Sequence, residues 1–173
     1  MKKSGFFIAK FLKTLSILTL IGVLLYAYYY LPEKLVTHFS KLDMPDEYMS
    51  KSGFFYGVGI IAVVFYAFSG LLSKMVQAVE VRYFIMPNRE YWTSTTEAKM
   101  YFYKIFSEWI SSLSLLINLF LIICVFVVLK SHGRDTMSMH DFKLLPLIGG
   151  MLFLFWIIFL PIRLRIKKYD LLN

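Results

Sequence analysis

Four long apolar runs dominate this 173-residue chain and limit what it can fold into. A helical run of about 18 apolar residues or more can cross a hydrocarbon core about 30 Å thick, because each residue advances a helix by about 1.5 Å. A helix is the expected conformation, since it pairs its own backbone amides where lipid offers no water. The predicted fold is therefore all-α, a single integral membrane domain built as a four-helix bundle. The spans are expected at about 11–31, 54–73, 108–129 and 145–162.

Composition agrees with a bilayer environment. Hydrophobic residues make up 58% of the chain and charged residues 17%, whereas soluble domains have roughly 45 to 50% and 25%. The first run follows Lys2 and Lys3, as the apolar region of a secretory signal peptide would. However, no small-residue cleavage site follows it, and Lys10 and Lys13 interrupt its start, so it is expected to remain as the first span.

The basic residues predict the orientation. Thirteen of the nineteen Lys and Arg residues fall in the N-terminus, the second loop and the C-terminus, and six fall in the first and third loops. By the positive-inside rule, the chain is expected to be a multi-pass protein of the cytoplasmic membrane with both termini in the cytoplasm. A basic rim that faces anionic lipid accounts for the net charge of +8, so no nucleic-acid partner is expected.

Polar and small residues inside the spans predict helix contacts. Ser111, Ser114 and Asn118 recur at i, i+3 and i+7, which places them on one face of the third span. Such a face serves either as interhelical hydrogen-bonding contacts or as the wall of a polar solute path. Gly53 and Gly57, four residues apart, predict a close helix approach in the second span.

The second loop is expected to contain a cytoplasmic interfacial helix that runs into the third span. Ser94, followed three residues later by Glu97, is typical of a capping box at a helix start. Trp92 and Arg89 are interpreted either as membrane-interface anchors or as contacts for a partner, the anchor being the preferred interpretation.

The first loop, "LPEKLVTHFSKLDMPDEYMSK", is expected to form a compact extracytoplasmic cap, since Pro32 ends the first helix. Phe39 is predicted to be buried against the outer ends of the helices, with His38 on the neighbouring, wetter side. Three roles remain open for His38: bonding the loop backbone, recognising a ligand or partner, or forming a metal or catalytic site with nearby acids such as Asp46 and Glu47.

The same loop resembles a bacterial membrane family known only as a domain of unknown function. That family's module also forms the N-terminal part of immunity proteins against a sporulation-delaying peptide toxin. The pattern runs Leu-Pro, His-Phe, Pro-Asp and Ser-Lys, and here its positions are Leu31, Pro32, His38, Phe39, Pro45, Asp46, Ser50 and Lys51. The "MPNREYW" segment at 86–92 is similar to a segment of the shorter, four-span members. The resemblance implies partner recognition by the outer loop. We expect His38, Phe39, Pro45, Asp46 and Lys51 to contact the partner.

No hydrolase, phosphate-loop or redox motif occurs, so no catalytic residue, cofactor or metal is predicted, and the single Cys124 excludes an intrachain disulfide. The leading hypothesis is a non-enzymatic sensor, immunity-like protein or accessory subunit that recognises a membrane or extracytoplasmic peptide or protein. Besides this partner and the lipid bilayer, an oligomer is compatible with the sequence. One alternative is a small-solute or lipid transporter subunit with a continuous polar cavity. The other is a membrane enzyme, which would require His38, His132 and His140 to converge on zinc.

Overall fold

The computed structural model describes residues 4–40, 44–132 and 139–166. Four long helices run in alternating directions: α1 (Ser4–Tyr30), α2 (Lys51–Ala78), α4 (Thr96–His132) and α5 (Leu144–Arg165). All four are long and apolar enough to cross a membrane, which confirms the predicted all-α membrane fold. The short elements are β1 (Lys34–Phe39), β2 (Pro45–Ser50), η1 (Val81–Tyr83), α3 (Arg89–Ser94) and η2 (Met139–Phe142).

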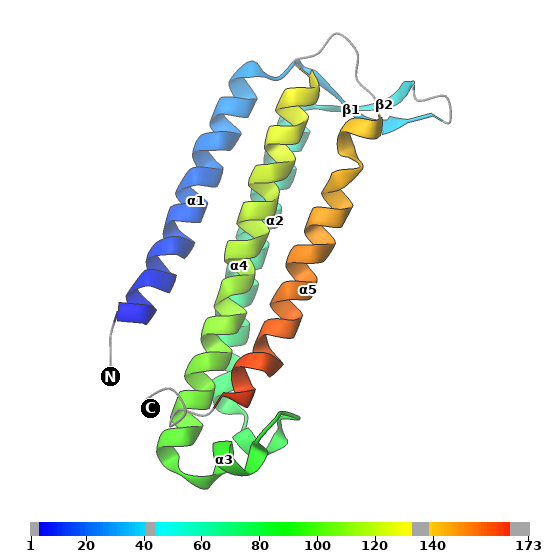
Figure 1. Ribbon diagram of the computed structural model, residues 1–173. Helices are drawn as coiled ribbons and strands as arrows, with labels where there is room; N and C mark the ends of the chain where they lie inside the picture. The colour runs from blue at the N-terminus through cyan, green and yellow to red at the C-terminus, as the bar shows by residue number, and fades with distance from the viewer. Residues whose placement is uncertain (1–3, 41–43, 133–138, 167–173) are drawn as a thin grey trace.

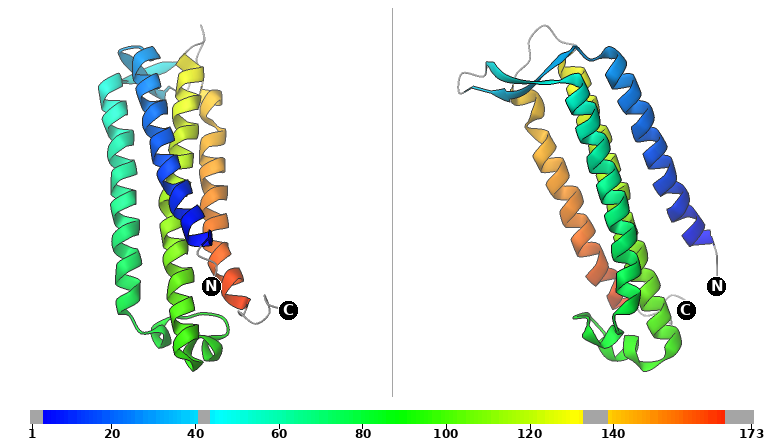
Figure 2. Two further views of the ribbon diagram at one scale, coloured as in Figure 1. Left: turned by 90° about the vertical axis from the view of Figure 1, so that its left-hand side faces the viewer. Right: turned by 180° about the vertical axis from the view of Figure 1, so that it is seen from behind.

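Helix α4 is the centre of the bundle, with α1, α2 and α5 packed around it (Figures 1 and 2). It contains 37 residues and is therefore about 55 Å long, well beyond the thickness of a hydrocarbon core. The β-hairpin lies at one end of the bundle, beside the end of α4. Helix α3, η1, the start of α1 and the end of α5 lie at the opposite end.

The structure corrects the predicted start of α4. Ser94 is the last residue of α3, and its hydroxyl donates to the carbonyl of Tyr91. The α4 cap is instead Thr95, whose Oγ1 accepts a hydrogen bond from the amide of Ala98 at 3.1 Å. The expected interfacial helix and the third span form one continuous helix, because nothing between them interrupts the backbone hydrogen bonds.

Buried apolar residues form two separate clusters. The cluster at the hairpin end of the bundle, called the outer cluster, joins α1, α2 and α4. Its members are Leu20, Leu24, Ala27, Leu31, Leu35, Val58, Leu121 and Val125. The cluster at the opposite end, called the inner cluster, joins α4 and α5 to the segment between α2 and α4, which is called the second connection. Its members are Val81, Trp92, Phe102, Ile105 and Leu164. The two ends of the bundle are thus stabilised by different sets of side chains.

Trp92 is a core residue of the inner cluster, so its interpretation as a membrane-interface anchor is wrong. The side chain is 0% exposed, and its indole N–H donates to the carbonyl of Leu164 at 3.1 Å. Asn88, with a left-handed backbone (φ 55°), donates from its side-chain amide to the carbonyl of Arg165 at 2.9 Å. The second connection therefore provides partners for backbone carbonyls at the end of α5, which no helical residue can satisfy.

Small residues allow close contact at a different place from the one predicted. A Cβ added at Gly57 would meet no atom within 4 Å, so the expected close approach at this glycine is wrong. In contrast, a Cβ added at Gly149 of α5 would lie 2.9 Å from the ring of Phe120 on α4. The close approach is therefore between α4 and α5.

Two tryptophans make the principal polar contact between α4 and α5. The rings of Trp109 and Trp156 are stacked, with centroids 4.0 Å apart and an interplanar angle of 8°. Each indole N–H donates to the backbone carbonyl of the other tryptophan, at 2.7 Å and 3.0 Å. This arrangement satisfies both indole donors inside an apolar environment.

Candidate functional site

The predicted cap loop is a β-hairpin at one end of the bundle, which the sequence pattern did not predict. Helix α1 ends at Tyr30, just before Pro32, and β1 then pairs with β2 in an antiparallel ladder. The register is regular from Lys34 to Val36 and shifts around Thr37 and His38. Alternation of apolar and polar residues is weak in both strands, so the usual signal of a half-buried strand is missing.

Leu35, rather than Phe39, anchors the hairpin in the bundle. Leu35 is 2% exposed and belongs to the outer cluster, together with Leu31. Phe39 is only half-buried, and its ring lies 6.0 Å from that of Phe142 in η2. The predicted burial of Phe39 against the helix ends is therefore wrong, because the ring lies against a connecting segment instead.

His132 joins the hairpin to α4, a role that the sequence did not indicate. The imidazole Nδ1–H donates to the carbonyl of Val128 at 2.9 Å, and Nε2 accepts from the amide of Val36 at 3.2 Å. A backbone amide is only a donor and a carbonyl only an acceptor, so this pair of contacts fixes the neutral, Nδ1-protonated tautomer. His132 therefore provides the acceptor for the Val36 amide, a backbone group of β1 that faces away from β2.

We expect the substitution His132→Leu to loosen the hairpin. It leaves the Val36 amide without an acceptor, at a cost of about 1 to 3 kcal/mol where the group stays buried. In hydrogen exchange of the protein in lipid nanodiscs, the amides of β1 should exchange about tenfold faster or more. His132→Gln is the matched control, since its carbonyl oxygen can replace Nε2. Equal protection of Val36 in the wild type and in His132→Leu would contradict this role.

His38 and Asp46 form an exposed pair across the hairpin. The His38 Nδ1 lies 2.7 Å from Asp46 Oδ1, and the side chains are 60% and 43% exposed. The hydrogen bond that His38 donates to Asp46, together with the negative charge of Asp46, raises the pKa of His38 above its ordinary value, with a smaller contribution from Glu47. Two of the five residues predicted to contact a partner are thus brought together, with His38 on the wet side as expected.

The raised pKa of His38 predicts how the pair responds to pH. A histidine whose folded pKa is raised adds stability below its unfolded pKa, and that stability is lost as pH rises through the folded pKa. The contact should therefore be tightest in mildly acidic solution. In an NMR titration of His38, Asp46→Asn should move the midpoint down toward the ordinary value of histidine. An unchanged midpoint in Asp46→Asn would show that the pair does not form.

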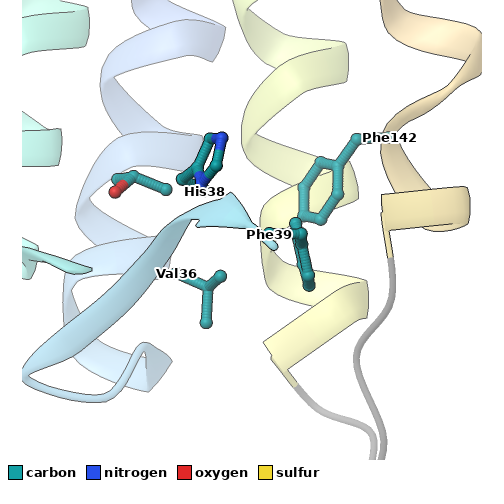
Figure 3. Close-up of a pocket in the computed structure, with 5 residues that line it drawn as sticks. Val36, His38, Phe39 and Phe142 are labelled. Carbon is teal, nitrogen blue, oxygen red and sulfur yellow. The ribbon is translucent and has the colours of Figure 1, made fainter. Parts of the chain in front are cut away.

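A pocket of about 310 Å³ opens beside this pair (Figure 3). Apolar surface from Val36, Phe39 and Phe142 lines it together with Thr37 and His38. Phe142 was missed from the sequence because the contact that brings η2 to β1 is long-range. The pocket can hold a side chain or a small apolar group, with an imidazole at its edge.

Pro45 is the first residue of β2, and Lys51, the first residue of α2, directly follows the strand. The Lys51 ammonium forms an ion pair with Glu33 at 2.8 Å and lies over the Tyr28 ring, 5.0 Å from its centroid. This side chain is only 16% exposed, so its charge already has a partner inside the chain. Pro45 is half-buried beside the turn, opposite Phe39 in the ladder.

The predicted polar face of α4 lies inside the bundle. Asn118 is 1% exposed and donates to Ser16 Oγ of α1 at 3.1 Å. Ser114, also buried, donates to the carbonyl of Ser111 within its own helix. Further polar contacts connect α1 to α2 and α2 to α4; they are Lys13 with Ser69, and Ser73 with Ser107. Asn118 of this face thus makes an interhelical hydrogen bond, while the role of the face as a whole stays a prediction.

Within the described residues, no three His, Cys, Asp or Glu side chains are placed to share a metal ion. The convergence of His38, His132 and His140 that an enzyme would require is therefore not found in this part of the chain. His132 is instead bonded to two backbone groups.

The fold defines a class of protein, a helical membrane protein with four candidate spans and a β-hairpin at one end. Comparison with protein-family models, curated proteins and solved structures finds no match to this chain. The resemblance of the first loop to the family of unknown function stays a prediction.

Proposed function

We propose that this chain is a non-enzymatic protein of the cytoplasmic membrane whose hairpin recognises a membrane or extracytoplasmic peptide or protein partner. Sensor, immunity-like protein and accessory subunit are the roles that fit. The observation that carries the proposal is the exposed His38 and Asp46 pair beside the pocket. Binding sites are typically apolar concavities with a few fixed polar groups, and this pocket with its neighbouring pair has both features.

The way in which the hairpin is held supports a binding role. Leu35 in the outer cluster and His132 on α4 fix β1 to the bundle, whereas β2 is mostly exposed. A recognition surface benefits from such a rigid support, because less conformational entropy is lost on binding. His38 and Asp46 belong to this supported platform without contributing to its buried core.

The proposed orientation places the hairpin outside and the end that carries α3 in the cytoplasm. The excess of Lys and Arg near that end favours this topology under the positive-inside rule. A membrane-impermeant maleimide tests it on intact cells in a Cys124→Ala background. Tyr48→Cys should be labelled and Tyr83→Cys should not; labelling of both from outside would contradict the topology.

Photo-crosslinking in native membranes tests recognition directly. A benzophenone amino acid at Thr37, on the pocket, should capture a discrete peptide or protein, which mass spectrometry would then identify. The same group at Val63, a 68% exposed residue in the middle of α2, is the matched control for lipid contact. His38→Ala should fold normally and abolish the capture at Thr37. Lipid adducts alone at both positions would overturn the proposed function.

The transporter alternative rests on the polar face of α4, and Asn118→Leu distinguishes the two roles of that face. If Asn118 only bonds Ser16, the change should lower the free energy of unfolding by about 1 kcal/mol. A double-mutant cycle with Ser16→Ala should show a coupling energy of similar size, measured by unfolding in mixed micelles. Normal stability combined with loss of function would instead support a polar solute path.

A further inference from the structure

In the described part of the hairpin, β2 is exposed along the edge that faces away from β1. The first described residue of β2, Pro45, is half-buried, and the five that follow it are all exposed. In contrast, the edge of β1 that faces away from β2 already has a partner at Val36, whose amide donates to His132. An exposed strand edge presents backbone groups that can pair with another strand.

The pairing pattern identifies which backbone groups of β2 face this edge. The amide of Lys51 donates to the carbonyl of Glu33 at 3.0 Å, so these two residues form a hydrogen-bonded pair. Bonded and non-bonded pairs alternate along an antiparallel ladder, which makes Val36 and Tyr48 a non-bonded pair. The Val36 amide does point away from β2, toward His132, as this alternation requires. The amide and carbonyl of Tyr48 therefore point away from β1, toward the free edge.

The charges on this edge favour one kind of occupant. Asp46 and Glu47 lie next to Tyr48, and no described side chain forms an ion pair with Glu47. Two copies of β2 that met edge to edge would bring these acids together, which is unfavourable. An extended segment with basic side chains would complement them.

We propose that an extended, basic segment of the partner adds to β2 as a third strand, with its main chain bonded to the amide and carbonyl of Tyr48. This mode rests on the proposed function, since it describes how the outer hairpin holds its partner. Main-chain bonds would supply binding, and Glu47, which has no ion-pair partner among the described residues, would select basic side chains. The pocket beside β1 stays open in this arrangement.

A capped hexapeptide of alternating lysine and valine is a suitable probe. Its binding is measured by fluorescence anisotropy with the full chain in phosphatidylcholine nanodiscs, whose neutral surface does not attract the peptide. We expect saturable binding, at least about tenfold tighter than that of a glutamate and valine peptide of the same length. Tyr48→Pro, which removes the outward amide, should weaken binding about tenfold or more, while Tyr48→Ala should bind as the wild type does.

A second peptide tests strand addition on the wild-type chain, so that this test does not depend on the folding of the Tyr48→Pro variant. N-methylation of every residue of the lysine and valine peptide removes all its backbone donors, so this peptide should bind the wild-type chain about tenfold more weakly or worse. Equal binding of the methylated and unmethylated peptides, or of the basic and acidic peptides, would overturn strand addition. If these tests fail while capture at Thr37 persists, the hairpin recognises its partner in another way. Loss of the capture at Thr37 as well would overturn the proposed function itself.

Discussion

We expect Trp156→Ala to detach α5 from the rest of the bundle. Removal of a closely packed tryptophan side chain typically costs about 3 to 5 kcal/mol. Here the substitution also removes the stacked ring of the pair, together with the indole N–H that donates to the carbonyl of Trp109 and to Ser112 Oγ on α4. Helix α5 depends strongly on this contact, since no residue of its most apolar window, the half-buried Trp156 included, is fully buried in the bundle.

The measurement for Trp156→Ala is resistance to unfolding in mixed micelles, together with protease cleavage near the ends of α5. Phe155→Ala is the matched control, because Phe155 is a neighbouring aromatic residue of α5 that is 66% exposed. The control should unfold as the wild type does, whereas Trp156→Ala should release α5 before the other helices separate. Equal behaviour of the two variants would show that the tryptophan pair does not hold α5.

The second large effect is expected for Trp92→Ala, at the opposite end from the hairpin. This side chain fills the inner cluster, and its loss would leave a cavity between α3, Phe102 and Leu164. The carbonyl of Leu164 would also lose its indole donor. The combined cost is about 3 to 5 kcal/mol in the free energy of unfolding.

The Trp92→Ala variant should be compared with Trp92→Phe and Tyr83→Ala in the same unfolding experiment. Trp92→Phe keeps most of the apolar contact and should fall between the wild type and alanine. Tyr83 is 67% exposed, so its removal should have little effect. A wild-type transition for Trp92→Ala would show that the inner cluster adds nothing to stability. Normal hairpin exchange in Trp92→Ala would show in addition that the two ends open independently.

The separation of the two clusters suggests why such independence is expected. The hairpin is held by Leu35 and His132 through the outer cluster and the end of α4. The second connection is held by Trp92 and Asn88 on the end of α5. Residues of one group have no contact partner in the other, so substitutions at the two ends should be additive.

The sequence by itself determined the membrane fold, because the length and hydrophobicity of a run set the number of helices that a bilayer accommodates. The same holds for Pro32, which ends α1, and for Ser50, whose hydroxyl accepts from the amide of Gly53 at the start of α2. These are local effects of residue type on the backbone. The inward position of Asn118 also followed from its helical spacing.

Only the tertiary structure decided which side chains form the candidate site and its support. Leu35 took the buried position expected of Phe39, and Phe142 came to the pocket from a segment about a hundred residues away. Trp92 became a core residue, and His132 became the acceptor for Val36. Each of these roles depends on contacts between residues far apart in the chain, which the spacing of residues within a single helix or strand cannot reveal.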